Sequence, residues 1–231
     1  ALAGVPVVIG EDVIAKDAGL VVDGLKVIQS PLIAEMVSAF RRYERVFGDI
    51  ILQANFDDEY HGVLEYALER LGVKSVELKF GQAAKGIQGY GRVPKIEDAL
   101  RFKKLGYIVR PNPADPSVAE AHARGVGPVF ERIGKLPMWS PEYLIKRVDE
   151  LRNRGAERVC FKTGPFDPRD IARILEIASE AGVDLVTLDG AGGGTGSSPA
   201  KMMNEWGIPT VTLEAIVCRV LRGLEKAGKP L

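Results

Sequence analysis

Short apolar runs alternate with amphipathic segments along most of the chain. The apolar runs predict strands at residues 50–54, 75–80, 107–110, 158–163 and 184–189. Apolar residues at helical spacing predict helices at 57–71, 95–104, 140–154, 168–181, 199–206 and 215–226. Strands that alternate with helices of this length indicate parallel pairing, with the helices packed outside the sheet.

The strand composition and the loops favour a barrel over an open sheet. From the apolar residues Val76, Leu78 and Phe80, the run at 75–80 is interpreted as a strand buried on both faces. Long polar loops follow the carboxyl ends of the strands, where barrel active sites are built. We therefore predict an α/β fold of the (β/α)8 TIM-barrel type, with residues 1–231 as one domain. The chain supplies about five to six of the eight βα units, so the barrel is incomplete; an open parallel sheet is the alternative.

Several segments depart from the regular alternation. Residues 5–9, 20–22 and 25–29 predict short extended pieces, the last two joined as a hairpin by Asp23-Gly24, and residues 30–45 predict a helix. Residues 82–94 and 111–139 are interpreted as irregular loops. Residues 209–213 predict a short strand or extended connection.

Composition excludes several classes of partner. The 231 residues carry 31 basic and 31 acidic side chains and have a mean hydropathy of +0.01. Zero net charge offers no electrostatic footprint for nucleic acid or an anionic membrane. The sequence shows neither a signal peptide nor an apolar run of membrane-spanning length, so we expect a cytoplasmic protein that binds a small molecule at a local site.

The cysteines and histidines do not predict a metal site. Cys160 and Cys218 lie far apart, which excludes a disulfide framework and a cysteine-ligated iron–sulfur cluster within this chain. Cys160 lies in an apolar run and is interpreted as a small buried hydrophobe. His61 and His122 lack metal-ligand spacing and are interpreted as exposed or capping residues.

A glycine-rich segment after the strand at 184–189 is the sharpest chemical signal. Five glycines fall within residues 190–196, and Thr195, Ser197 and Ser198 add hydroxyl donors. Such a loop between a strand and a helix lets backbone N–H groups approach a phosphate, a flavin edge or a carboxylate. The alternative is a flexible turn without a ligand. No lysine follows as in a Walker loop, and the spacing is not that of a Rossmann fingerprint.

Two lysines lie where barrel chemistry is expected. Lys85 lies in a glycine- and alanine-rich loop with Gln82 close by, where it either holds a substrate carboxylate or is a solvated loop lysine. Lys162 ends an otherwise apolar strand, so its ammonium group must reach the barrel mouth or pair with a carboxylate. We favour a functional role for Lys162 because catalytic groups of barrels lie at strand ends.

Five segments, in order, resemble motifs of the FMN-binding synthase domain of glutamate synthases. Residues 8–12 are similar to its Ser-Gly-Glu-Gly-Gly turn, and residues 53–56 fall at its Gln-Val-Ala-Ser-Gly-Arg-Phe strand end. Residues 82–86 are similar to its Gln-Gly-Ala-Lys-Pro loop, and residues 161–163 match its Val-Lys-Leu strand. Residues 189–199 are similar to its Asp-Gly-Gly-Thr-Gly-Ala-Ser-Pro loop. The order and approximate spacing agree over most of the chain.

This resemblance implies an FMN-dependent oxidoreductase that reduces 2-iminoglutarate, formed from 2-oxoglutarate and ammonia, to glutamate. It implies catalytic roles for Glu11, Lys85 and Lys162, and flavin contacts for Gln53 and Lys162. Lys85 and Glu11 would face the 2-oxo acid. The implied flavin contacts also include Gly192, Gly193, Gly194, Thr195 and Gly196, and the implied substrate contacts include Gln82 and Ser197.

The chain departs from the family pattern in several places. The opening barrel strand would precede Ala1, whereas the phosphate-binding glycine loops and the iron–sulfur cysteines would follow Leu231. Gly91 stands near the position of a family glutamine, and the turn at Gly10-Glu11 lacks the second glycine pair. These departures leave two alternatives: a non-catalytic barrel scaffold that needs a partner chain or missing segments, and another FMN barrel enzyme with a different small carboxylate substrate. An oxidase of 2-hydroxy acids is disfavoured, because neither histidine lies at a strand end.

Overall fold

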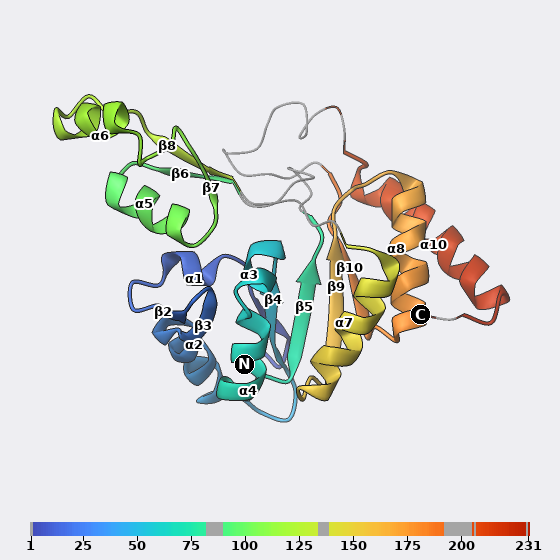
Figure 1. Ribbon diagram of the computed structural model, residues 1–231. Helices are drawn as coiled ribbons and strands as arrows, with labels where there is room; N and C mark the ends of the chain where they lie inside the picture. Colours follow the sequence, from blue (N-terminus) through green and yellow to red (C-terminus); the bar gives the residue numbers. More distant parts are fainter. Residues whose placement is uncertain (1, 82–89, 134–138, 192–204, 206, 230) are drawn as a thin grey trace. The chain divides into compact units, whose positions relative to one another are not determined.

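The computed structural model describes residues 2–81, 90–133, 139–191, 205, 207–229 and 231 (Figure 1). The chain divides into two compact units, residues 1–86 with 137–231, and residues 87–136. None of the described helices is both long and apolar enough to cross a membrane.

The larger unit is built on a five-stranded parallel sheet of order β1-β4-β5-β9-β10. Its strands are β1 (Val7–Ile9), β4 (Ile50–Ala54), β5 (Ser75–Lys79), β9 (Arg158–Thr163) and β10 (Leu185–Leu188). Their order in the sheet is their order along the chain, as in a barrel, and the intervening segments carry helices. The larger unit is therefore an incomplete TIM-type barrel, which confirms the predicted fold class.

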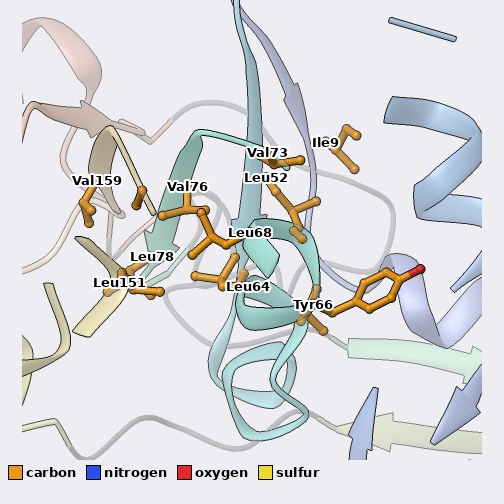
Figure 2. Packing of buried hydrophobic residues seen from close by; sticks show 14 of the residues in the cluster. Ile9, Leu52, Leu64, Tyr66, Leu68, Val73, Val76, Leu78, Leu151 and Val159 are labelled. Atoms are coloured by element: carbon orange, nitrogen blue, oxygen red, sulfur yellow. The ribbon is translucent and has the colours of Figure 1, made fainter. Parts of the chain in front are cut away.

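Helices cover one face of this sheet and form the main hydrophobic core. Leu64 and Leu68 of α4 (Val63–Leu71) pack against Leu52 and Val76 of the strands (Figure 2). Val148 and Leu151 of α7 (Pro141–Asn153) belong to the same core. Other helices described in this unit include α2 (Pro31–Arg41), α3 (Phe56–Tyr60), α8 (Pro168–Ala181) and α10 (Thr210–Lys226).

Side-chain caps fix where several helices begin. Ser140 accepts a hydrogen bond from the Tyr143 N–H at 3.1 Å at the start of α7, and Asp167 accepts one from the Arg169 N–H at 2.8 Å at the start of α8. At the carboxyl end of α8, Gly182 adopts a left-handed φ of 65°, a conformation that glycine accepts without strain. The sequence therefore sets these boundaries locally.

The predicted helix at 57–71 is broken into α3 and α4. Gly62 has a left-handed φ of 69°, and His61 before it is buried, with its Nδ1 2.7 Å from the Leu25 carbonyl oxygen. Leu25 lies at the turn of a hairpin formed by β2 (Val21–Asp23) and β3 (Lys26–Gln29). The predicted hairpin is confirmed. Of the two interpretations of His61, an exposed position is wrong because this tertiary contact buries the ring, whereas a capping position is confirmed because His61 is the C-cap of α3. A short helix, α1 (Val13–Lys16), precedes the hairpin.

The smaller unit has an antiparallel sheet of its own. Strands β6 (Tyr90–Val93), β8 (Phe130–Ile133) and β7 (Ile108–Arg110) lie in that order, with helices α5 (Ile96–Lys104) and α6 (Pro116–Ala123). Arg132 lies over the rings of Phe102 and Tyr107, 5.2 and 4.7 Å from their centroids. The prediction of irregular loops at 82–94 and 111–139 is thus wrong where β6, α6 and β8 lie. The predicted strand at 107–110 exists but pairs antiparallel, outside the parallel sheet.

The predicted strand at 209–213 is also wrong. Helix α10 begins at Thr210, and the only extended pairing described for this segment is a single parallel bridge between Ala191 and Pro209. The run Thr210-Val211-Thr212 is rich in β-branched residues, which favour strands, but Pro209 precedes it at the N-cap and the helix buries Leu213 and Val217. Tertiary burial outweighs the local propensity here.

Candidate functional site

The inner face of the parallel sheet, opposite α4 and α7, carries polar side chains near the carboxyl ends of the strands. Strand residues alternate between the two faces, so Glu77 and Lys79 share one face of β5 while Val76 and Leu78 pack into the helical core. The register places Gln53 of β4 beside Glu77, and Lys79 beside Lys162 of β9. The inner face therefore gathers these groups at one place, although they lie far apart in the sequence.

Glu77 lies at the centre of this inner face and is 2% exposed. Its Oε1 accepts a hydrogen bond from Gln53 Nε2 at 2.5 Å, and its Oε2 accepts one from the Thr187 hydroxyl at 3.1 Å. Thr187 belongs to β10, two strands away from β5, so this bond spans β9 over the small side chain of Cys160. A contact across an intervening strand requires a curled sheet, as in a barrel wall.

Glu11, in the turn after β1, forms a buried ion pair with Lys79. Lys79 Nζ lies 2.6 Å from Glu11 Oε1, and the two side chains are 7% and 14% exposed. Removing two charges from water is costly unless they are closely paired, which explains the short contact. The pair also ties the β1 turn to the end of β5.

Lys162 is the more accessible lysine of the site. Its Nζ lies 3.2 Å from Asp189 Oδ2, at the carboxyl end of β10, and the side chains are 22% and 33% exposed. The ammonium group has three N–H donors, and Asp189 is its one ion-pair partner among the described residues, so it can also donate to a ligand oxygen. Lys162 therefore has the position and the exposure of a ligand-binding cation.

A buried acidic cluster supports the turn that carries Glu11. Asp58 Oδ2 accepts hydrogen bonds from the backbone N–H groups of Asp12 at 3.0 Å and Asn55 at 3.2 Å. Asn55 Nδ2 donates to Asp12 Oδ1 at 3.1 Å, and Asp12 itself has a left-handed φ of 64°. Burial, and then the negative charge of Asp12, raise the pKa of Asp58 to about 8. Asp58 is therefore mostly protonated at neutral pH.

The acidic run 57–59 forms the first turn of α3, where acidic side chains interact favourably with the helix dipole. All three residues are buried. Glu59 accepts hydrogen bonds from Arg147 of α7 at 2.7 and 3.0 Å, and Arg147 also pairs with Glu65 at 2.8 Å. Burial raises the pKa of Glu59, although the charge and hydrogen bonds of Arg147 oppose this change. This network joins α3 and α4 to α7 and has a structural role.

The structure brings together three of the predicted site residues on the inner face and its rim, Glu11, Gln53 and Lys162. Lys79 pairs with Glu11 and lies beside Lys162, and Glu77 holds Gln53. Several predicted site residues lie outside the described residues: Gln82, Lys85, Gly192, Gly193, Gly194, Thr195, Gly196 and Ser197. For these, the assigned roles stay predictions.

Sequence reasoning missed four members of the site: Glu77, Lys79, Thr187 and Asp189. Asp189 belongs to the site as the ion-pair partner of Lys162. The available signal was the alternation in Ser75-Val76-Glu77-Leu78-Lys79, where every second residue is polar. The apolar residues of this run suggested burial on both faces. Both faces are indeed buried, but one of them is polar.

The predicted burial of Cys160 is confirmed. Cys160 is buried and free, and burial, followed by the charge of Glu77, raises the pKa of its thiol to about 12. Cys218 is exposed. Among the described residues, no group of three or more His, Cys, Asp and Glu side chains has a geometry that would hold a metal ion.

One comparison with known proteins finds a match. Residues 135–228 match the family model described as the conserved region in glutamate synthase. No curated protein and no solved structure matches the chain. The matched segment contains α7, β9 with Lys162, α8, β10 with Thr187, the glycine-rich segment and α10. Residues 135–228 are therefore similar to the conserved region of glutamate synthase, and this segment includes β9, which carries the half-buried Lys162.

Proposed function

We propose that the inner face of the sheet binds FMN and that the protein is an FMN-dependent oxidoreductase of the glutamate synthase type. Its reaction would reduce 2-iminoglutarate, formed from 2-oxoglutarate and ammonia, to glutamate. The observation that carries this proposal is the position of Lys162, at a strand end within the matched region and paired with Asp189 at 3.2 Å. The family match supports a glutamate synthase-like role. The substrate and the cofactor are proposed in addition to it.

The described residues fit a flavin. A reduced isoalloxazine ring carries negative charge at one edge, and it presents both N–H donors and carbonyl acceptors. Lys162 would place a cation beside that edge, and Gln53 would offer a neutral amide. When bound and reduced by an electron donor, FMN would supply the hydride that reduces the imine carbon and would itself become oxidised.

The protein's own groups would bind and orient the reactants. Lys162 would stabilise negative charge on the cofactor, as a fixed cation in a site from which water is partly excluded. Lys79 and Glu11 form a buried pair at the rim, and Glu11 would face the 2-oxo acid together with Lys85 and Gln82. Because Lys79 neutralises Glu11, this carboxylate can lie near an anionic substrate with less repulsion.

Flavin titration tests the proposal directly. The purified chain is titrated with FMN and with riboflavin, and the change in the visible flavin spectrum gives a dissociation constant for each. The riboflavin arm separates recognition of the ring from recognition of the phosphate. Saturable binding is expected, and Lys162→Ala should weaken it about 10- to 100-fold, the effect of one lost charge-assisted hydrogen bond. Lys146→Ala is the matched control, because Lys146 is an exposed lysine on α7.

A second measurement tests the reaction. Flavin bound to the protein is reduced under anaerobic conditions, and 2-oxoglutarate with ammonia is added while the flavin spectrum and glutamate are followed. Reoxidation with formation of glutamate is expected, and neither 2-oxoglutarate nor ammonia alone should produce it. Absence of any flavin binding would favour the barrel scaffold, whereas binding without glutamate formation would favour another FMN barrel enzyme.

A further inference from the structure

The buried Glu77 has a chemical effect on its neighbour that the proposed function does not assign. An ionised carboxylate accepts hydrogen bonds and donates none. The side-chain amide of Gln53, 2.5 Å away, must therefore turn its nitrogen toward Glu77. The same reasoning makes Thr187 a donor to the second oxygen of Glu77, at 3.1 Å.

This arrangement fixes which atom of Gln53 remains for a ligand. A free glutamine side chain can rotate to offer either its amide nitrogen or its carbonyl oxygen, and the two orientations have opposite hydrogen-bonding character. Because the Gln53 amide nitrogen is bound to Glu77, the Gln53 carbonyl oxygen is the atom that points away from Glu77 and can face a ligand. Glu77 is itself held by Thr187 and is almost completely buried, so it cannot easily move to release the amide.

We propose that Glu77 is a positioning residue that holds Gln53 as a hydrogen-bond acceptor for an N–H group of the flavin ring. This inference rests on the proposed function, because it takes a flavin as the ligand. Glu77 need not touch the ligand, since it acts through Gln53. An isoalloxazine ring has such an N–H donor, whereas a ring edge that carries only acceptors would be rejected.

An exchange of the two side chains tests the inference. Gln53→Glu alone places two carboxylates side by side in a buried site, so it should lower stability and weaken FMN binding at least tenfold. Adding Glu77→Gln restores a hydrogen bond of reversed direction, because the new amide at position 77 can donate to the new carboxylate at position 53 and still accept from Thr187. That carboxylate then keeps a free oxygen that accepts from the flavin. The double variant should recover its urea midpoint and return to within about threefold of the wild-type FMN affinity.

The outcomes separate the inference from the proposed function. If the wild type takes up neither FMN nor riboflavin, the proposed function fails and the inference fails with it. Another result is that the wild type binds flavin and the double variant recovers stability, but its FMN affinity stays at least tenfold weaker. In that case the proposed function stands, and only the role of Gln53 as a hydrogen-bond acceptor is wrong. If the double variant does not recover stability, the direction of the hydrogen bond between Gln53 and Glu77 is wrong. Glu180→Gln, the same change at a position of α8 outside the site, serves as the control.

Discussion

The free energy of unfolding of an Asp58→Asn variant should increase relative to that of the wild type as the pH rises from 5 to 8. The pKa of Asp58 is about 8 in the folded protein, against an ordinary value of 3.8. Between these two values the folded state holds a proton that the unfolded state has released. Unfolding therefore becomes easier as the pH rises, and the effect levels off above pH 8.

The magnitude follows from the pH window. One pH unit corresponds to about 1.36 kcal/mol for one proton. From pH 5 to pH 8, wild-type Asp58 should therefore lower the free energy of unfolding by about 4 kcal/mol, three units times 1.36. Asparagine carries no titrating proton, so this loss should be absent in Asp58→Asn. The difference between variant and wild type should grow by that amount.

The asparagine fits the hydrogen bonds that Asp58 makes. Its carbonyl oxygen can replace Oδ2 and accept from the N–H groups of Asp12 and Asn55. Its amide nitrogen would occupy the position of Oδ1, which has no hydrogen-bond partner among the described residues. That unpaired donor adds a cost independent of pH, so the absolute difference is less informative than its slope.

Urea unfolding at pH 5, 6, 7 and 8, followed by far-ultraviolet circular dichroism, measures the slope. Asp170→Asn is the control, because Asp170 lies exposed in the first turn of α8 and the same substitution there removes a carboxyl group outside the buried cluster. A difference between Asp58→Asn and wild type that stays constant across this range would refute the reasoning. It would mean that Asp58 is ionised in the folded protein.

Other buried groups allow three more tests. Lys79→Met should lower the free energy of unfolding by about 3–5 kcal/mol because it removes the cation 2.6 Å from the largely buried Glu11 carboxylate, and adding Glu11→Gln should restore most of the loss in urea unfolding. Arg147→Met should cost a similar amount, about 3–5 kcal/mol, because its glutamate partner on α3 is also buried, and the shift of the urea midpoint measures it. Iodoacetamide at pH 8 should label Cys218 in the native protein and Cys160 only after unfolding, as peptide mass spectrometry would show; labelling of both at equal rates would contradict the burial of Cys160.

The sequence predicts the elements whose local signals agree with their tertiary setting. Helices α7 and α8 begin at Ser140 and Asp167, where the capping residue, the proline and the apolar spacing all indicate the same start. The parallel strands are predictable because the faces they turn toward the helices are continuously apolar. In these elements, local propensity and burial favour the same structure.

Elements whose setting is not local were missed. Strands β6 and β8, Tyr-Gly-Arg-Val and Phe-Glu-Arg-Ile, are short and contain charged residues, so no apolar run marks them. Their pairing partners lie some 40 residues apart in the sequence. The burial of the His61 ring was missed for a related reason, since only the hairpin at Leu25 shows that the ring is covered.

The polar inner face shows why site residues can be harder to predict from sequence than the fold that positions them. A residue such as Glu77 is tolerated in a buried strand only because Gln53 and Thr187 satisfy its oxygens, and those partners come from strands that sequence alone does not place in register. Recognition by motif found Gln53 and Lys162, which would contact a ligand. It could not find Glu77, whose effect is exerted through its neighbours. Groups of this kind become visible when the hydrogen-bond partners of each buried polar atom are traced, because a carboxylate fixes the orientation of every amide and hydroxyl that it accepts from.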